Sequence, residues 1–343
     1  MTSLSSAVET AATQTSLAAS EKLHQSVPLG RFARAHVMPV VRRLSTVSNL
    51  RTASYIALHW AVIIAAVWAA LASGHWLVYL AAGVVIGTRM QALGVMLHDG
   101  THWLLFTNRT VNDVCSDLFL AFPLGLSTEL YRATHFRHHR FTNTEEDPDL
   151  AIQREDHDWF AWPKTRAGCA WVLVKSLLGL NMFKAAPFYK QWSPWYNFFN
   201  RRCALSHRAR LLLVVSTAVV YAGVVATGKP LQILLLFLIP SVTVLNLVNR
   251  IRATAEHLET PGDHELNATR TVLPSWWERL VIAPLGVNYH LEHHLFPSVP
   301  SPNLGKLHRV LMEDEEFRAR AHLTRTYVGV IGELMRARSP RRA

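Results

Sequence analysis

Nine histidines in this sequence have spacings that suit metal binding. Eight of them form the clusters HDGTH, HFRHH and HLEHH, and a ninth follows the segment RATAE. Residues three or four apart on a helix share one face, so each cluster directs its imidazoles to one side. The candidate metal ligands are His98, His102, His135, His138, His139, His257, His290, His293 and His294.

Histidines outside such clusters are more often hydrogen-bonded core or surface residues than metal ligands. Burying eight clustered imidazoles side by side without a cation would cost free energy that nothing offsets. His257 stands alone, and its sequence context leaves both interpretations open. We expect no metal-binding role for His24, His36, His59, His75, His157, His207, His264, His308 and His322.

Nine imidazoles are too many ligands for a single structural zinc, which takes four ligands and usually includes thiolates. Shared between two ions, they give four or five nitrogens each and leave coordination positions open. Imidazole suits iron, copper and zinc alike, so the residues predict a dinuclear site, and iron only if the chemistry is oxidative. Cys115, Cys169 and Cys203 are widely spaced and predict neither a disulfide framework nor a thiolate site.

Four apolar segments predict the elements that position these clusters. They cover residues 53–72, 76–88, 211–227 and 231–248. A very short connection joins the first two segments, and another joins the last two. A helix of about 20 residues spans the roughly 30 Å hydrocarbon core of a bilayer. We therefore predict an all-α integral membrane protein with four transmembrane helices in two hairpins. A soluble bundle is the alternative, but buried soluble helices seldom run so long without a charge.

The net charge of +11 fits this topology, because basic residues flank the apolar segments. Cytoplasmic loops of membrane proteins are enriched in Lys and Arg, so both termini are expected in the cytoplasm. The basic residues lie in no recognisable nucleic-acid module, and we predict no nucleic-acid partner. The bilayer is the partner that the charge pattern favours.

A common metal site requires every cluster to lie on one side of the membrane. The segment from Val114 to Leu126 is interrupted by Asp117 and Pro123. If it crossed the membrane, it would separate the first two clusters, so we predict an interfacial or re-entrant helix there. The segment from Trp276 to Leu285 is too short to cross. All clusters are then expected in one cytoplasmic histidine-rich cap.

The chain is expected to divide into three parts. Residues 1–45 form a cytoplasmic tail, mobile over residues 1 to about 25; residues 46–310 form the membrane domain; and residues 311–343 form a basic cytoplasmic segment. The basic segment is expected to contact lipid. A second hypothesis is that its arginines attract an acidic electron carrier.

The ordered motifs resemble those of the membrane fatty acid desaturase superfamily, whose three histidine boxes read HxxxH, HxxHH and HxxHH. The resemblance covers roughly residues 50–310 and includes RFTNTEEDPDL after the second box and NYHLEHHLFPSVPSPNLGKLH around the third. It implies a non-haem di-iron centre that activates O2, with all nine histidines as iron ligands. Some relatives place an Asn four residues before the extra histidine; here that position is Ala253, so a water-bridged ligand is not implied.

At least some of the carboxylates near these histidines are expected to accept hydrogen bonds from the ring nitrogens that do not bind metal. The alternative is that they are ordinary solvated side chains. The candidates are Asp99, Asp147, Asp149, Glu256 and Glu292.

The function that the resemblance implies is O2-dependent introduction of a C=C bond into a fatty acyl group of a lipid or thioester. Alternatives are a hydroxylase or ketolase of the same superfamily, or a desaturase of a small amino-acid-derived substrate. A metal carrier is disfavoured, because its ligands would lie near the middle of the membrane spans. Residues 83–88, GVVIGT, are candidates for setting the length of a substrate tunnel.

An external electron donor is expected, of ferredoxin or cytochrome b5 type. The sequence has no HPGG haem motif and no iron–sulfur cysteine set. The short chain without a recognisable fused domain is typical of a bacterial inner-membrane protein.

Overall fold

A computed structural model describes residues 30–156, 158, 162–200 and 205–336 of the chain. The mobile tail predicted for residues 1 to about 25 lies outside the described residues. The same holds for His24, His157, Cys203 and the last seven residues of the basic segment, 337–343.

Four helices of the described chain are long and apolar enough to cross a membrane, as predicted. They are α3 (Asn49–Ser73), α4 (Trp76–Thr101), α12 (His207–Ala226) and the continuous helix Pro230–His257. The last is built from α13 (Pro230–Pro240), the π-helical turn η3 (Ser241–Leu245) and α14 (Asn246–His257). The second and fourth helices run beyond the predicted apolar segments and reach the first histidine cluster and His257.

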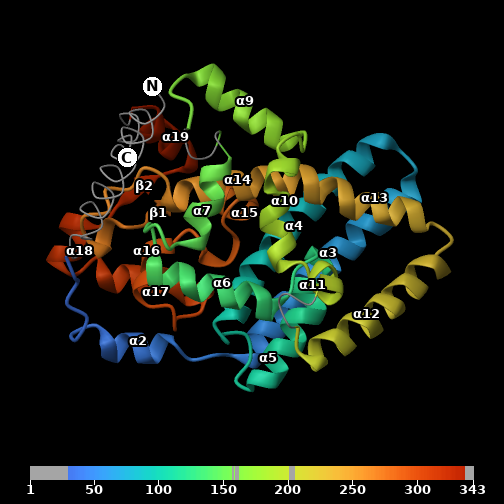
Figure 1. The fold of residues 1–343 in the computed structure, drawn as a ribbon, viewed down its shortest axis with the longest axis horizontal. Coiled ribbons are helices and arrows are strands. Elements are labelled where there is room, and N and C mark those ends of the chain that lie inside the picture. Colours follow the sequence, from blue (N-terminus) through green and yellow to red (C-terminus); the bar gives the residue numbers. More distant parts are fainter. Residues whose placement is uncertain (1–29, 157, 159–161, 201–204, 337–343) are drawn as a thin grey trace, which may run out of the picture.

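Short polar turns separate the two helices of each pair. The Ser48 hydroxyl accepts the Arg51 N–H and begins α3, and Gly74, with a φ of 63°, ends it. Only glycine adopts this left-handed conformation without a steric cost. Between α12 and α13 the turn contains Gly228, with a φ of 69°, before Pro230 at the start of α13. Figure 1 shows α12 and α13 diverging from this turn.

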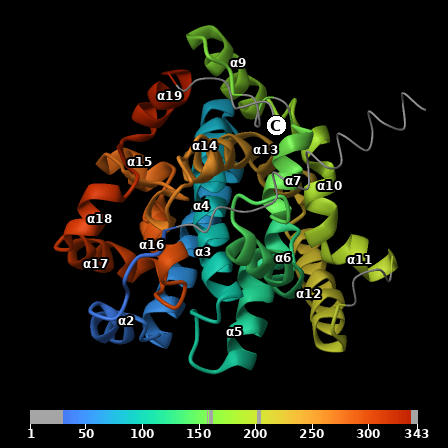
Figure 2. The same ribbon diagram turned by 60° about the vertical axis from the view of Figure 1, so that its left-hand side comes forward.

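Helix α4 is the most enclosed of the four spans. Of its most apolar window, 61% is buried, against 22% for α3 and 11% for α12. Figure 2 shows it near the middle of the molecule, with α17 and α18 on one side and α10 and α12 on the other. Gly87 permits its close packing, because a Cβ there would lie 2.6 Å from the Val244 Cβ in η3.

The chain between the first two clusters is a series of short helices. They are α5 (Arg109–Ser116), the π-helical η1 (Asp117–Ala121) and the 3₁₀ turn η2 (Phe122–Leu124). The chain then turns at Gly125, whose φ is 72°, and enters α6 (Thr128–Phe141). The two residues expected to interrupt this segment, Asp117 and Pro123, lie in η1 and η2.

The remaining elements cover the histidine clusters and include a small sheet that was not predicted. Strands β1 (Thr271–Leu273) and β2 (Leu323–Arg325) pair in parallel. The predicted basic segment contributes β2 and two helices, so it is partly folded onto the rest of the chain. The other helices are α2 (Met38–Leu44), α7 (Pro148–Glu155), α9 (Arg166–Leu177), α10 (Met182–Trp192), α11 (Pro194–Asn200), η4 (Glu265–Asn267), α15 (Trp276–Val281), η5 (Pro284–Gly286), α16 (His290–Leu295), α17 (Ser301–Leu311), α18 (Glu315–Arg320) and α19 (Tyr327–Arg336).

Separate apolar clusters support the spans and the histidine-bearing elements. Ile63, Ile86 and Leu93 belong to a cluster between α3 and α4. Leu291 and Phe317 belong to another, beneath α16 and α17. The third histidine cluster therefore rests on an apolar core of its own.

Candidate metal centre

The first cluster lies at the carboxyl end of α4. His98 is in the last turn and His102 is the residue that caps the helix. The last carbonyls of a helix have no partner within it. Here Arg132 supplies one, because its guanidinium donates to the carbonyls of Thr101 at 2.7 Å and Gly100 at 3.0 Å. Since Arg132 belongs to α6, this contact joins the first cluster to the second.

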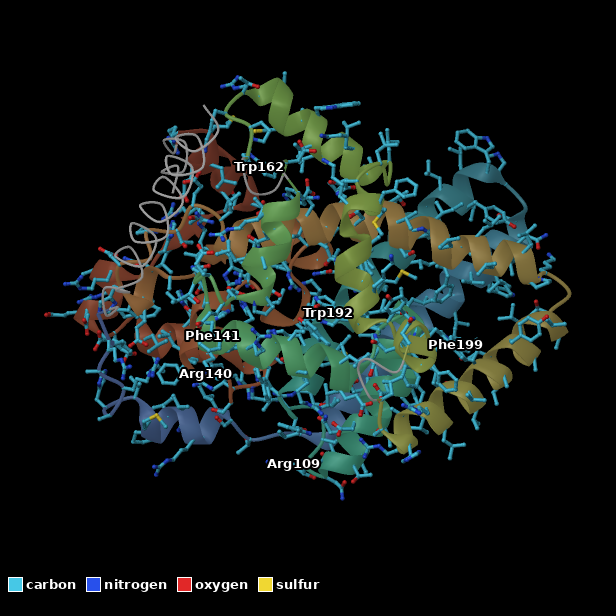
Figure 3. All side chains as sticks on the ribbon, viewed as in Figure 1. Arg109, Arg140, Phe141, Trp162, Trp192 and Phe199 are labelled. Carbon is cyan, nitrogen blue, oxygen red and sulfur yellow. The ribbon has the colours of Figure 1, made fainter. Side chains whose placement is uncertain are left out.

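The second cluster lies in the last two turns of α6. The amino end of this helix is held by Asp117, whose carboxylate accepts the Thr128 N–H at 2.9 Å. The helix ends at Phe141, labelled in Figure 3, and the chain reverses at Asn143, which has a φ of 62°. This turn brings the EEDPD segment back against the histidines.

The third cluster lies on α16, a helix of only six residues. Contacts of Glu292 hold this helix in place. The Glu292 carboxylate accepts the Thr271 hydroxyl at 2.5 Å and lies 2.6 Å from His308 Nδ1. His257 reaches the same place as the last residue of α14. Helix α4, α6, α14 and α16 thus meet through their histidines.

The structure brings all nine predicted histidines together and divides them into two groups. The members of each group offer ring nitrogens that lie within 4.8 Å of one another. The five-histidine group is His98, His102, His135, His139 and His293. The four-histidine group is His138, His257, His290 and His294.

The Nε2 atoms converge within each group. In the five-histidine group, His135 Nε2 lies 2.9 Å from His102 Nε2 and 3.0 Å from His139 Nε2. In the four-histidine group, His290 Nε2 lies 2.8 Å from His257 Nε2 and 3.1 Å from His294 Nε2. Several ring nitrogens therefore face one small volume in each group, which is the arrangement a bound cation would stabilise.

Burial keeps most of these imidazoles neutral. It lowers the pKa of His102 to about 4 and that of His139 to about 2. Burial, and then the neighbouring histidines, hold the pKa values of His135 and His290 well below the ordinary range. A neutral imidazole has the lone pair that a metal requires. The donor set and its protonation state therefore fit a pair of metal ions.

His138 differs because carboxylates lie beside it. Its Nδ1 lies 3.0 Å from Asp147 Oδ1 and 3.6 Å from an Asp149 oxygen. Burial alone would lower the pKa of His138, but the hydrogen bond to Asp147 and the charge of Asp149 raise it above its ordinary value. A hydrogen bond from Nδ1 also fixes the tautomer that leaves the Nε2 lone pair free.

The other three predicted carboxylates do not hydrogen-bond to a clustered histidine. An oxygen of Glu256 lies 3.7 Å from His290 Nδ1, and one of Asp99 lies 3.8 Å from His98 Nδ1. Asp99 instead accepts the N–H and hydroxyl of Ser301, at 3.0 and 2.5 Å. Glu292 is bonded to Thr271 and His308. Among the five candidates, Asp147 is therefore the one with the expected hydrogen bond to a clustered histidine.

The described histidines that were assigned no metal role lie outside both groups. His75 is exposed and caps α4, whereas His308 is buried beside Glu292. His59 is buried in α3, and neither of its ring nitrogens has a hydrogen-bond partner among the described residues. The histidines of this set that the structure describes are His36, His59, His75, His207, His264, His308 and His322.

A cavity of about 210 Å³ opens beside the histidines, and most of the residues that line it were not predicted from the sequence. Histidines of both groups line one end of it: His98, His135, His138, His257 and His290. Tyr131 and Trp192 line its side, and the Trp192 indole N–H, labelled in Figure 3, donates to the Thr134 hydroxyl at 2.6 Å. Polar residues of the spans also line it. A signal for them was present, since polar residues inside a membrane span are often functional.

The GVVIGT segment at 83–88 does not line this cavity, contrary to its suggested role in setting a tunnel's length. Met90, Gln91 and Gly94, about one turn further along α4, line it instead. Gly87 faces Val244, so the segment is used for helix packing. Ala253, the position that differs from some relatives, also lines the cavity.

Comparisons with known proteins point to one family. Residues 74–326 match the protein family described as "Fatty acid desaturase". A dihydrorhizobitoxine desaturase of Bradyrhizobium elkanii is 29% identical, over 78% of this chain and 76% of that protein. A chloroplastic omega-6 fatty acid desaturase of Glycine max is 26% identical, over 71% of this chain and 58% of that protein. An sn-1 oleoyl-lipid 12-desaturase of Anabaena variabilis is 22% identical, over 78% of each chain.

Proposed function

The chain belongs to the fatty acid desaturase family, and we propose that it is an O2-dependent desaturase whose nine clustered histidines hold two iron ions. Membership of this family makes it an oxidoreductase. The division of the nine histidines into groups of five and four is the observation that carries the proposal. Neither group contains a cysteine, and the oxidative chemistry of the family favours iron over the other metals that imidazole binds.

Iron bound in this site would supply the oxidising power needed to remove hydrogen from an unactivated C–H bond. In the overall reaction, O2 takes two hydrogens from adjacent carbons together with two electrons and two protons. The products are a C=C bond and two molecules of water. The two electrons come from an external carrier of ferredoxin or cytochrome b5 type, which the resemblance implies.

The protein's own residues orient the ligands and shape the substrate site. Asp147 accepts the Nδ1 proton of His138 and holds that ring with its Nε2 towards the four-histidine group. Arg132 fixes α6 against the end of α4, and this contact keeps His135 Nε2 2.9 Å from His102 Nε2. Tyr131 and Trp192 provide a rigid aromatic wall on which a substrate is held beside the histidines.

We further propose that the four spans form two membrane hairpins beneath a cytoplasmic histidine-rich cap. The carboxyl ends of α4 and α14 both contribute histidines to the groups, so these two spans end at the same membrane face. The series α5, η1 and η2 then lies in the interface between them. Both termini lie in the cytoplasm, and the basic residues and apolar spans suit a bacterial inner membrane.

The three-part division of the chain, at 1–45, 46–310 and 311–343, is kept as part of this proposal. Arg318 and Arg320 are exposed in α18 and are available to an acidic carrier or to anionic lipid. For the substrate, the sequence favours a fatty acyl group. The cavity favours the small polar alternative, which the next subsection develops.

Metal analysis and mass spectrometry test the proposal together. Protein purified from iron-replete cells is expected to carry close to two irons per chain, and His138→Ala is expected to lose part of that iron. Cells with the wild type, but not with His138→Ala, should form a species lighter by two hydrogens. Stoichiometric zinc without iron would contradict the proposal, and a species heavier by one oxygen would favour a hydroxylase or ketolase.

A further inference from the structure

The cavity beside the four-histidine group is lined by side-chain amides at the end away from the histidines. Gln91 lies near the middle of α4, and Asn246 and Asn249 lie near the start of α14. Asn181, just before α10, lines the same cavity. A hydrocarbon chain that filled this space would bury these amides against apolar carbon, which costs free energy unless each amide has a partner.

The orientation of Asn181 follows from its neighbours. The Asn246 Nδ2 donates to the Ser176 carbonyl at 2.7 Å, so the orientation of this amide is set by a backbone acceptor. The same Nδ2 donates to Asn181 Oδ1 at 2.8 Å. Asn181 Nδ2 is therefore a donor, and it is buried with no hydrogen-bond partner among the described residues.

Gln91 of α4 is a second buried amide of this kind. Its side chain is only 1% exposed, and its Nε2 has no hydrogen-bond partner in the described part of the chain. A buried donor without a partner costs about 1–3 kcal/mol. Both residues line one cavity, and a small rotation of either amide would present its donor to an oxygen acceptor brought by a ligand.

The two arginines that line this cavity are paired within the protein, whereas Lys184 Nζ, half exposed, lies 3.8 Å from an Asp156 oxygen. The Arg250 guanidinium lies 2.6 Å from an Asp156 oxygen, and Arg252 Nε lies 3.0 Å from a Glu256 oxygen. These pairs keep the wall polar, and an oxygen acceptor would not have to break them to reach the amides.

Length and volume limit the size of the occupant. Gln91 precedes His98 by seven residues on one helix, which corresponds to about 10 Å along its axis. An extended chain of about nine covalent bonds covers that distance. The cavity volume of about 210 Å³ is also below the roughly 300–1,000 Å³ of sites for drug-sized ligands.

We propose that the substrate is a small polar molecule, whose carboxylate or amide oxygen accepts hydrogen bonds from Gln91 and Asn181 while its alkyl part lies beside the histidines. This inference rests on the proposed desaturase function and specifies its substrate class. A long acyl chain is the alternative occupant. It would place its methyl end against the same amides.

The test supplies both substrate classes to the iron-loaded, purified protein. The protein receives O2, photoreduced ferredoxin and either the aqueous or the lipid extract of cells of its source organism. We expect a product lighter by two hydrogens in the aqueous extract. We also expect Gln91→Leu to need at least about ten times more substrate for the same rate. The isolated substrate should raise the melting temperature of metal-free wild type, but not that of Gln91→Leu.

His59→Leu is the matched control, since it also removes an unpartnered polar group from a span but lies outside the cavity. It is expected to keep the wild-type substrate requirement. If Gln91→Leu does not fold, Asn249→Leu tests the same wall. Equal effects of the cavity and control variants would overturn the inference.

The two extracts separate failure of this inference from failure of the proposed function. A lighter product in the lipid extract alone would overturn the small-substrate inference and leave the desaturase proposal standing. No lighter product in either extract would overturn the desaturase proposal itself. An aqueous product heavier by one oxygen would change the reaction type but support the substrate class.

Discussion

The two histidine groups use the same side chain, but they differ in what lies behind the rings. In the four-histidine group, Asp147 accepts a hydrogen bond from His138, and a Glu256 oxygen lies 3.7 Å from His290. In the five-histidine group, the nearest predicted carboxylate is Asp99, 3.8 Å from His98 and bonded to Ser301 instead. Negative charge is therefore concentrated behind the group with fewer nitrogens.

This difference indicates that the two metal positions are not equivalent. In the five-histidine group, an ion would be held by five uncharged ligands. Four nitrogens with carboxylates close to their rings hold an ion partly through charge, which raises ligand basicity. The cavity is lined by three of the four members of the smaller group and by two of the five members of the larger group. We expect the two positions to differ in metal affinity and in their response to substitution.

Removing one ligand from each group gives the largest expected effect. His138 and His139 are neighbours in the sequence but belong to different groups. Each change to Ala should lower activity by ~100-fold or more, since even residues behind the ligands contribute 10–100-fold. Iron should fall from two towards one per chain, with a different position emptied in each variant. Metal analysis and X-ray absorption spectroscopy check this, with His75→Ala as the control. Two irons retained in both variants would contradict the division.

Replacing Asp147 with Asn tests the charge behind the four-histidine group. The amide keeps the shape and can still accept from the Asn143 N–H, now 2.8 Å away, but it lacks the negative charge. Metal affinity or activity should fall by about 10–100-fold, at one of the two positions only. Competition with a chelator measures this. Glu145→Gln, on the same loop, should not change it, and equal weakening of both positions would count against the asymmetry.

Glu292→Gln should affect stability more than metal binding, although Glu292 adjoins His293. Its partners are Thr271 and His308, and its side chain is fully buried. Loss of the charged acceptor should cost about 1–3 kcal/mol of unfolding free energy. Denaturation of the metal-free protein measures the loss. The folded fraction should still bind two irons, and a selective loss from one position would assign Glu292 to the metal site.

Asp99→Asn has the smallest expected effect. Asp99 accepts the N–H of Ser301, the first residue of α17, and so acts as a cap supplied by another helix. Replacing such a cap costs about 0.5–2 kcal/mol. Thermal unfolding should register this loss while iron content stays unchanged. A loss of iron from the five-histidine group would mean that the 3.8 Å approach to His98 supports the metal after all.

Local sequence patterns predicted the spans and the eight clustered histidines, whereas His257 was included through the family resemblance. The spans follow from the apolar composition of about 20 consecutive residues, and helical spacing places His135, His138 and His139 near one face. The division into two groups was not predictable, because adjacent residues on a helix differ by about 100° in direction. That angle separates His138 from His139, and the other helices decide which group each one joins.

The same geometry explains which carboxylates were predicted well. Asp99 and Glu292 are next to histidines in sequence, and the helix therefore turns them away from the neighbouring ring. Asp147 is nine residues from His138, and the left-handed Asn143 turn brings it back. The cavity depends on contacts between α4, α10 and α14, which no local pattern contains. The hydrogen bond between Asn246 and Asn181 is one such contact, across 65 residues.

The pairing of β1 with β2 has a consequence for the order of events during synthesis. Thr271, which holds Glu292 of α16, belongs to β1, and β1 pairs with Leu323–Arg325. The ribosome adds β2 only after all nine histidines have been made. Until then β1, which holds the helix that carries His290, His293 and His294, lacks its partner strand. Metal loading is therefore expected late, in a nearly finished chain, and a ribosome stalled before Leu323 should present a polypeptide that inserts into the membrane but retains little iron.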